Sequence, residues 1–323
     1  MRAVVCPESG PPEVVEVQDV PAPSLKAGQA RVAVACAAAN FPDVLVIAGE
    51  YQVKVPTPFV PGSEFAGTVT EVAGDVTSVA VGDRVTGTGI VGAFAEQVCA
   101  TAAGLKKIPE SISDEVAAAF GVAHRTAYHT LRSVARIKAG DHVIVLGAGG
   151  GVGLAAVQLA VAIGATVTAV ASSDEKLAVA KDYGATTVIN HRNADLRTAL
   201  RELVPQGADA VIDPVGGDQS EPALRALGRG GRFVTIGYAS GTIPRIPLNL
   251  VLVKGVHVLG FQFQDLPPDE YRRNEDELAE LLVEGTAVPH IGATYPLERA
   301  ASALRLVANG QAIGKVLVTV ATP

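Results

Sequence analysis

One uncharged stretch, residues 143–173, limits what this chain can fold into. About 20 consecutive apolar residues suffice for a transmembrane helix. However, five glycines fall within residues 147–153, and each costs about 1 kcal/mol relative to alanine inside a helix. The glycines instead divide the stretch into a β-branched strand at 143–146, a tight turn, an apolar helix at about 151–163 and a second strand at 166–170. We therefore predict a buried βαβ unit of a globular protein rather than a membrane span.

The composition is typical of a globular protein with about two domains. Its 323 residues are 48% hydrophobic and 18% charged. The net charge of -7 argues against nucleic acid or an anionic membrane surface as the main partner. Three cysteines without metal-type spacing, Cys6, Cys36 and Cys99, indicate neither a disulfide framework nor a metal site. The N-terminal residues lack the apolar length of a signal peptide, and we expect a cytoplasmic protein.

The first hundred residues carry short β-rich runs between frequent glycines and prolines. Strands at such spacing, without intervening helices, predict a rolled or barrel-like β domain. One helix at about residues 42–48 interrupts this domain and has a proline near its first turn. The expected strands are residues 2–6, 14–17, 30–35, 65–72, 84–88 and 94–100.

After residue 109 strands alternate with helices, which predicts a doubly wound parallel sheet. The tail adds two helices and a strand that we expect to return to the first domain. The predicted fold class is α/β, with a β-rich domain at 1–117 and 263–323 and a nucleotide-binding domain at 118–262. The expected strands are 143–146, 166–170, 187–189, 210–212, 233–236, 256–259 and 315–320, and the expected helices are 117–120, 126–135, 151–163, 175–182, 195–203, 220–227, 269–284 and 300–309.

The glycine turn has the spacing of a dinucleotide-binding fingerprint. A small first residue allows the tight turn, the second lets the backbone approach a pyrophosphate, and the third lets the helix pack on the strand. The free N–H groups at the start of the helix then face the phosphates. The alternative is a glycine-rich turn with a structural role only. The residues expected to contact the dinucleotide are Ala148, Gly149, Gly150, Gly151, Val152 and Gly153.

The end of the second strand of this unit bears on which dinucleotide binds. NAD sites usually place an acidic residue there, on the ribose hydroxyls. This strand instead ends in Ser172 and Ser173, and Lys176 follows one helical turn later. Because hydroxyl donors and a cation suit a 2′-phosphate, we predict NADPH. Asp174 and Glu175 complicate this interpretation, although acidic residues also suit a helix start. The alternative is that Ser173 is only an N-cap and Lys176 only part of a solvated face.

Motifs along nearly the whole chain carry a family resemblance. They are ANFPD at 39–43, PGSEFAG at 61–67, VGDRV at 81–85, TAYH at 126–129, DPVGG at 213–217, GRFVTIG at 231–237 and GKVL at 314–317. Together they resemble the zinc-independent, zeta-crystallin-like quinone oxidoreductases of the medium-chain dehydrogenase/reductase superfamily. The resemblance implies a GroES-like catalytic domain split across the chain ends, a central Rossmann domain and a substrate cleft between them. It also implies a homodimer joined by edge strands of the Rossmann sheets, here Val256 to Leu259.

The resemblance also bears on metal content. Zinc-dependent relatives use a cysteine where this chain has Asn40, a histidine where it has Ser63 and another cysteine near Val122. Their four-cysteine structural lobe has no counterpart, since Cys99 stands alone. We therefore predict no zinc site. Without a Lewis acid to polarise a carbonyl, simple alcohols are poor candidates, and quinones and α,β-unsaturated carbonyls are the expected acceptors.

Three residues of the first domain are candidates for catalysis. Asn40 either donates a hydrogen bond to substrate or caps the helix that follows. Asp43 either lines the cleft or serves only the first turn of that helix. Tyr51 falls where relatives carry a pocket tyrosine, the suggested proton donor in related enoyl reductases; the alternative is a buried tyrosine with a satisfied hydroxyl. The resemblance places Thr126 near the nicotinamide.

The remaining cofactor contacts are expected at the carboxyl ends of parallel strands, where open α/β sheets bind ligands. Two departures from the family pattern weigh against NADPH. His191 stands where relatives often carry a tyrosine, and Gly310 falls where some carry a phosphate-binding arginine. Because a histidine can still donate to a phosphate, NADPH remains the prediction. The expected contacts are His191, Asp213, Val215, Gly237, Tyr238 and Phe261.

Three functions remain open at this point. The leading hypothesis is an NADPH-dependent, zinc-independent reductase of quinones or other conjugated carbonyls. The first alternative is a reductase of 2-enoyl thioesters, for which Tyr51 is the relevant residue. The second is an NADPH-binding protein with a structural or RNA-binding role, as zeta-crystallin relatives illustrate, although an acidic chain without a basic stripe speaks against RNA. We expect a small-molecule substrate and a homodimer, with neither nucleic acid nor membrane as a partner.

Overall fold

The computed structural model describes residues 1–320, which form two compact units. Unit 1 comprises Met1–Val122 and the chain from Pro289 onward, and unit 2 comprises Ala123–Val288. We expected the boundaries at 117 and 263. The second boundary differs most, because helix α9 (Pro268–Val283) packs on α3 (Ala123–His129) and so belongs to unit 2.

Unit 1 is built on a predominantly antiparallel sheet whose long central strand is β3 (Gln29–Ala39). The strand order is β14–β15–β3–β4–β5–β7, and β6 also pairs with β3. Buried and half-buried residues alternate along the first part of β3, and its last four residues are all buried. The turn that follows, at Asn40, therefore lies inside the unit. The other strands are β4 (Glu64–Val72), β5 (Arg84–Thr88), β6 (Gln97–Thr101), β7 (Lys106–Lys107), β14 (Ile291–Pro296) and β15 (Lys315–Thr319).

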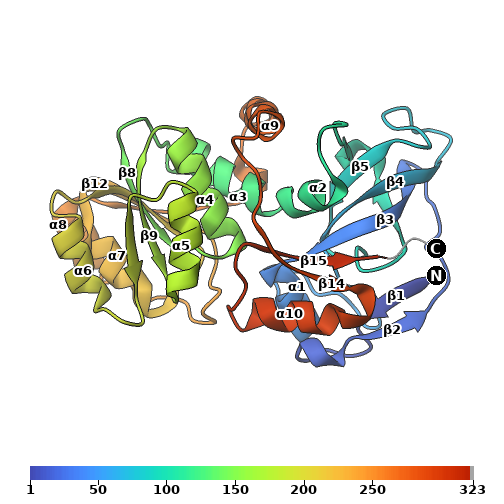
Figure 1. Ribbon diagram of the computed structural model, residues 1–323, viewed down its shortest axis with the longest axis horizontal. Coiled ribbons are helices and arrows are strands. Elements are labelled where there is room, and N and C mark those ends of the chain that lie inside the picture. Colours follow the sequence, from blue (N-terminus) through green and yellow to red (C-terminus); the bar gives the residue numbers. More distant parts are fainter. Residues whose placement is uncertain (321–323) are drawn as a thin grey trace. The chain divides into compact units, whose positions relative to one another are not determined.

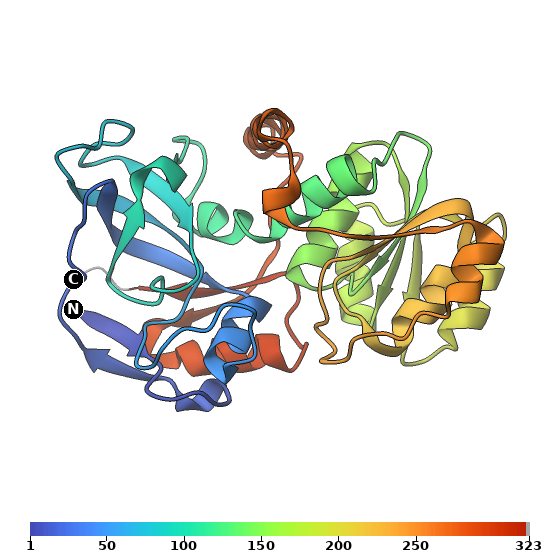
Figure 2. The same cartoon turned by 180° about the vertical axis from the view of Figure 1, so that it is seen from behind.

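Smaller elements complete unit 1. Strands β1 (Arg2–Val5) and β2 (Glu16–Asp19) form a separate antiparallel pair. Helix α1 (Phe41–Ala48) lies beside α10 (Ala300–Ala308), as Figures 1 and 2 show, and α2 (Asp114–Phe120) packs on β3 and β4. Large apolar side chains fill the space between the sheet and the helices; they include Ile47, Phe65, Phe94, Leu297 and Leu304.

Unit 2 is a doubly wound sheet of six parallel strands in the order β10–β9–β8–β11–β12–β13. The strand order reverses after β10, so α4 and α5 cover one face and α6, α7 and α8 the other (Figure 1). The strands are β8 (His142–Leu146), β9 (Thr166–Ala171), β10 (Thr187–Asn190), β11 (Ala208–Asp213), β12 (Leu227–Thr235) and β13 (His257–Gly260). The helices are α4 (Gly151–Ala162), α5 (Asp174–Asp182), α6 (Leu196–Leu203), α7 (Ser220–Arg225) and α8 (Leu248–Lys254).

The uncharged stretch has the predicted βαβ structure, with β8, α4 and β9 buried in the core of unit 2. Helix α4 has 12 residues, fewer than the roughly 20 needed to span a bilayer. Along residues 1–320, no helix combines the length and the apolar character needed to cross a membrane.

Several elements differ from those expected, and the short strand β7 was not predicted. Helix α3 ends at His129 and continues as a π-helical turn, Thr130–Val134, instead of one helix to residue 135. Helix α8 was not expected. Strand β14 was not expected either, because its sequence, IGATYP, contains glycine, alanine and proline, which are rare in strands. Parallel pairing with β15 outweighs these weak local preferences.

Candidate functional site

The turn between β8 and α4 has a shape that only small residues allow. Gly147 has a φ of +59°, and a Cβ on Gly153 would stand 2.1 Å from the Gly147 carbonyl oxygen. Gly150 is the N-cap of α4, and no side chain in the described part of the chain caps this helix end. The first N–H groups of α4 therefore remain open to an anion, as does the positive end of its dipole. Ala148 and Gly149 are buried in this turn, while Gly151 and Val152 are half-buried in the first turn of α4.

Lys176 lies against the glycine turn. A Cβ on Gly149 would stand 2.5 Å from the Lys176 Cβ, so the lysine stem occupies the space that a larger residue at 149 would need. Ser173, the N-cap of α5, accepts the Lys176 N–H at 3.4 Å and so fixes the backbone position of Lys176. Ser173 thus has the capping role that we gave as the alternative, and half-buried Ser172 precedes it. Burial lowers the pKa of Lys176, and the positive charge of Arg192 lowers it further.

His191 and Arg192 follow β10 and complete a basic group with Lys176. Burial lowers the pKa of His191, and the charges of Arg192 and Lys176 lower it further. The lowered pKa favours the neutral imidazole of His191, so Lys176 and Arg192 supply the positive charge of this group, which a bound anion would stabilise. The carboxylate of Asp174 is held by Asn190, whose Nδ2 donates to Oδ1 at 2.8 Å. Arg192 was not among our sequence candidates, although it directly follows His191.

Asp213 holds the loop after β11 in place. Its Oδ1 accepts the N–H groups of Val215 and Gly216, each at 2.8 Å, and its Oδ2 accepts the Ser220 hydroxyl at 2.6 Å. The carboxylate is fully buried and is committed to these three bonds. Val215 is positioned over the turn, since a Cβ on Gly147 would stand 2.6 Å from its Cγ2. Asp213 therefore orients this loop, and its carboxylate is not available to a ligand.

Two further residues expected to contact the cofactor, Gly237 and Tyr238, follow the carboxyl end of β12, at the same edge of the sheet as the loop after β11. Gly237 is half-buried and Tyr238 exposed. The Tyr238 ring lies beside Gly216, because a Cβ there would stand 2.9 Å from its Cδ1. Thr235, at the end of β12, has a buried hydroxyl without a hydrogen-bond partner in the described part of the chain. An orphaned hydroxyl at this edge is available to a ligand.

Phe261, just beyond β13, belongs to an aromatic cluster that fastens α9 to α3. Its ring is stacked with His129 at 6.4 Å and meets Phe263 edge-on at 4.8 Å, while Tyr271 of α9 stacks on the same histidine at 5.0 Å. Thr126 is half-buried on α3, one helical turn before His129. The cluster therefore places Phe261 by packing.

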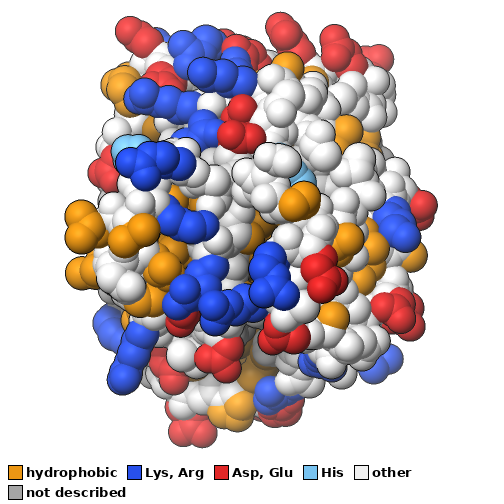
Figure 3. Space-filling view, turned by 90° about the vertical axis from the view of Figure 1, so that its left-hand side faces the viewer, with side chains coloured by type: hydrophobic (Ala, Val, Ile, Leu, Met, Phe, Trp, Pro, Cys, Tyr) orange, Lys and Arg blue, Asp and Glu red, His pale blue; other side chains and the backbone are white. Residues whose placement is uncertain are grey.

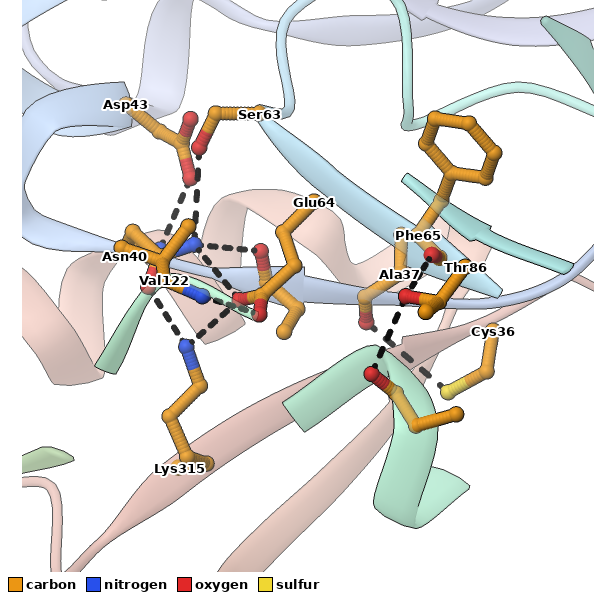
Figure 4. A network of polar contacts seen from close by, with 12 residues as sticks. Cys36, Ala37, Asn40, Asp43, Ser63, Glu64, Phe65, Thr86, Val122 and Lys315 are labelled. Atoms are coloured by element: carbon orange, nitrogen blue, oxygen red, sulfur yellow. Dashed lines mark hydrogen bonds and ion pairs between the residues drawn. The ribbon is translucent and has the colours of Figure 1, made fainter. Parts of the chain in front are cut away.

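Asn40, the first catalytic candidate, is buried in a polar network of unit 1 (Figure 4). Its Nδ2 donates to Ala38 O at 3.2 Å, to Ser63 Oγ at 3.4 Å and to Glu64 Oε2 at 3.1 Å. Its Oδ1 accepts from Lys315 Nζ at 2.5 Å. The amide is thus fully engaged inside the chain, and Asn40 is also the N-cap residue of α1. Glu64 and Lys315 were present in our motifs, but not among the candidate site residues.

Asp43 completes the start of α1. Its Oδ2 accepts the Asn40 N–H at 2.7 Å, while its buried Oδ1 has no partner in the part of the chain that is described. Burial raises the pKa of Asp43 to about 7, and the charge of Glu64 adds to this; Ser63, the Asn40 N–H and Lys315 oppose it. Asp43 is therefore a carboxyl group that changes its charge near neutral pH.

Tyr51 lies away from this network. It follows the C-terminal end of α1, whereas Asn40 and Asp43 lie at its start, and a helix of this length measures about 12 Å. The ring is half-buried, and its hydroxyl forms no hydrogen bond with the rest of residues 1–320. The structure thus brings Asn40 and Asp43 together but not Tyr51, and leaves the phenol free to donate.

The residues at the zinc-ligand positions of relatives are a poor donor set for Zn²⁺. Asn40 supplies an amide and Ser63 a hydroxyl, and the ammonium of Lys315 bonds the amide oxygen. No group of three or more histidine, cysteine or acidic side chains in residues 1–320 could hold a metal ion. The residues of unit 2 fit a dinucleotide much better. They provide the uncapped N-terminus of α4, a tight turn with no room for a Cβ at Gly153, and the basic group beside this turn.

Comparison with known proteins first defines the class. The model of the alcohol dehydrogenase GroES-like domain matches residues 26–110, and that of the zinc-binding dehydrogenase matches residues 151–280. A GroES-like unit combined with a Rossmann unit defines the medium-chain dehydrogenase/reductase superfamily of oxidoreductases. The predicted α/β fold class is confirmed.

Relatives matched over nearly their whole length then define the family. Quinone oxidoreductase-like protein 2 of Rattus norvegicus is 36% identical over 325 residues, which cover 98% of this chain and 92% of the relative. Human quinone oxidoreductase is 32% identical over 322 residues, covering 98% and 97%. Escherichia coli quinone oxidoreductase, determined with NADPH, superposes with a TM-score of 0.91 at 28% identity, covering 99% of this chain and 100% of that one. The chain belongs to the zinc-independent quinone oxidoreductase family, which confirms the resemblance.

Proposed function

We propose that the protein is an NADPH-dependent reductase that transfers hydride to quinones or other conjugated carbonyls without zinc. The observation that carries this proposal is the basic group, Lys176, His191 and Arg192, beside the glycine turn. A 2′-phosphate supplies negative charge opposite Lys176 and Arg192, and the His191 ring can donate a hydrogen bond to it. The E. coli relative and a mycobacterial one (31% identity, TM-score 0.91, covering 99% of both chains) were determined with NADPH.

Each part of unit 2 has a role in this proposal. The N–H groups at the start of α4 bind the pyrophosphate, and the basic group binds the 2′-phosphate. Asp213 keeps Val215 over the glycine turn, which shapes the cofactor site. NADPH, when bound, supplies the hydride. The residues proposed to line the nicotinamide half are Thr126, Val215, Gly237, Tyr238 and Phe261.

Conjugated acceptors fit the chemistry of the chain. An isolated carbonyl needs a strong electrophile to take a hydride, and the amide and hydroxyl at positions 40 and 63 do not supply one. A quinone or an α,β-unsaturated carbonyl spreads the developing negative charge over its own conjugated system. We therefore propose conjugated acceptors and expect simple alcohols and aldehydes to react slowly.

Tyr51 favours one specific alternative, the reduction of 2-enoyl thioesters. Addition of hydride to such a substrate gives an enolate that must be protonated, and the free Tyr51 hydroxyl is a suitable donor. Quinone reduction depends less on a single donor, because both oxygens of the product exchange protons with water. Tyr51→Phe should therefore slow enoyl reduction much more than quinone reduction if this alternative holds.

An apolar face of unit 2 supports a homodimer. Leu248, Leu252 and Val253 of α8 are exposed, and within residues 1–320 strand β13 pairs on only one side, with β12. Figure 3 shows hydrophobic side chains gathered at one edge of this end of the molecule, beside a band of lysine and arginine. Exposed apolar patches and unpaired strand edges are typical of interfaces. We propose a homodimer through β13 and α8, with neither nucleic acid nor membrane as a partner.

We also propose a cytoplasmic location. Cys6, Cys36 and Cys99 are all free, and burial raises the pKa of each thiol, which favours the unreactive protonated form. Free thiols are the usual state in a reducing compartment.

An acceptor screen tests the proposed function. NADPH and NADH are each combined with 1,4-benzoquinone, 9,10-phenanthrenequinone, crotonyl-CoA and a simple aldehyde, and absorbance at 340 nm is followed. We expect NADPH oxidation by the conjugated acceptors and little by the aldehyde. Faster turnover of crotonyl-CoA than of the quinones would favour the thioester alternative. Tight NADPH binding without turnover of any acceptor would instead favour a structural or RNA-binding role.

A further inference from the structure

A buried ion pair lies at the centre of the polar network of unit 1 (Figure 4). Lys315 Nζ donates to Glu64 Oε2 at 2.8 Å and to Asn40 Oδ1 at 2.5 Å. The side chains of Lys315 and Glu64 are only 4% and 0% exposed. Removing two charges from water costs more than their attraction returns unless hydrogen bonds complete the site, and an apolar pair of similar size is often equally stable. Stability alone therefore does not explain why the pair is present.

Glu64 also contacts the segment by which the chain leaves unit 1 for unit 2. Glu64 Oε1 accepts the N–H of Val122, the last residue before unit 2, at 2.7 Å. Gly121 permits this approach, since a Cβ there would stand 3.1 Å from the same oxygen. On the return, the backbone N–H of Lys315 donates at 2.7 Å to the carbonyl of His290, next to Pro289 where unit 1 resumes, and this bond does not involve the ammonium group. The paired side chains thus hold the start of α1 and the outgoing chain, and the backbone of Lys315 holds the returning chain.

We propose that Glu64 and Lys315 form a positioning pair for the reductase: they orient the Asn40 amide and Asp43 at the start of α1, and Glu64 holds the outgoing chain at Val122. This inference rests on the proposed function. Each charge has a separate task, because Lys315 fixes the acceptor end of the Asn40 amide, while Glu64 fixes its donor end and Val122. Neither residue is placed on substrate or cofactor.

Each charge of the pair should shift the pKa of Asp43 in a direction that can be measured. Asp43 faces Lys315 and Glu64 inside the network, together with the Ser63 hydroxyl and the Asn40 N–H. The ammonium lowers the pKa of Asp43 and the carboxylate raises it. Lys315→Met should therefore raise that pKa, and Glu64→Gln should lower it. A pair that only fills space would leave the titration of Asp43 unchanged.

The test uses Lys315→Met, Glu64→Gln and the double variant in the full chain. Lys315→Met leaves a buried carboxylate unpaired and should lower Tm, whereas the double variant leaves no unpaired charge and should regain most of the lost Tm. Despite this recovery, we expect kcat with the best acceptor to stay about 10- to 100-fold below the original value, because misplacement of a site by about 1 Å has effects of this size. The Kd for NADPH should change less than about twofold, since the basic group is untouched.

Lys107→Met is the matched control. Lys107 also pairs with a carboxylate in unit 1, Asp83 at 2.7 Å, but its side chain is 59% exposed. This variant should retain Tm and kcat, as exposed ion pairs contribute about 1 kcal/mol or less.

Two outcomes would overturn the positioning role. One is a double variant with restored Tm and an unchanged kcat; the other is an Asp43 carboxyl titration, followed by ¹³C NMR, that neither single variant shifts. The NMR titration needs no turnover. If the original protein reduces no acceptor, the proposed function fails, while shifts of the titration in opposite directions would still support the positioning pair.

Discussion

Arg192 is the residue at which the choice of cofactor is tested most simply. It is exposed, and its charge acts on both other members of the basic group. Charge-assisted hydrogen bonds contribute about 1.5–3 kcal/mol each. Arg192→Ala should therefore raise KM for NADPH roughly 10- to 100-fold and leave KM for NADH unchanged. Steady-state kinetics with both cofactors measures this, and Lys181→Ala, at the far end of α5, is the control. Equal effects on the two cofactors would contradict a 2′-phosphate contact.

Asp43 should give the protein a distinctive dependence of stability on pH. Its pKa rises from 3.8 to about 7 on folding. The native protein therefore binds a proton that the unfolded chain releases, so the stabilisation from Asp43 is complete below pH 3.8 and is lost as pH rises to about 7. Asp43→Asn removes this dependence. Between pH 5 and pH 8, the free energy of unfolding of the variant should rise relative to that of the original protein by on the order of a few kcal/mol, as measured by denaturant unfolding. The same difference at both pH values would contradict the raised pKa.

Single residues also show what the sequence could and could not reveal. The capping role of Ser173 was one of two alternatives because helix caps depend on neighbouring residues only. The contacts of Asn40 depend on Glu64 and Lys315, and the lysine lies 275 positions away. No local pattern identifies such a partner. The motif GKVL at 314–317 contained Lys315, but nothing in the sequence showed that its side chain is buried.

At the scale of elements, the glycine turn gives a prediction with its own control. Gly153→Ala forces a Cβ to within 2.1 Å of a carbonyl oxygen of the same turn, so β8 and α4 must separate. We expect Tm to fall markedly and NADPH binding to be lost. Gly150→Ala meets no atom closer than 3.5 Å and should keep Tm while weakening NADPH binding, because its added methyl faces the phosphate site. Thermal unfolding and NADPH titration measure both effects, and a stable Gly153→Ala variant would contradict the close packing.

The helices and strands could be predicted where the local pattern and the final environment agree. The central strands β8 and β9 of unit 2 are nearly continuous apolar runs because both faces of the sheet are covered there, and all six strands of the sheet were predicted. Strand β14 was missed because its pairing with β15, not its composition, makes it a strand. The assignment of α9 to unit 2 was missed for a similar reason, because the aromatic contacts that hold α9 on α3 come from residues distant in the sequence.

At the scale of the whole molecule, the exposed face of α8 should control assembly. Leu252 is 83% exposed, and a lysine there would place like charges across a two-fold interface. We expect the original protein to have twice the 33.0 kDa mass of one chain, and Leu252→Lys to be largely monomeric. Light scattering after size-exclusion chromatography measures the masses. Leu203→Lys, at an exposed apolar site on α6, is the control. A dimeric Leu252→Lys variant would place the interface elsewhere.

The central claim is that nicotinamide hydride passes directly to a conjugated carbon without a metal. The most direct measurement uses NADPH deuterated at the transferable position of C4, an enone acceptor and mass spectrometry of the product, in buffer containing a strong chelator. We expect one deuterium at the β-carbon, a primary isotope effect on the loss of absorbance at 340 nm and no effect of the chelator. A product without deuterium, or activity abolished by the chelator and restored by zinc, would contradict the account.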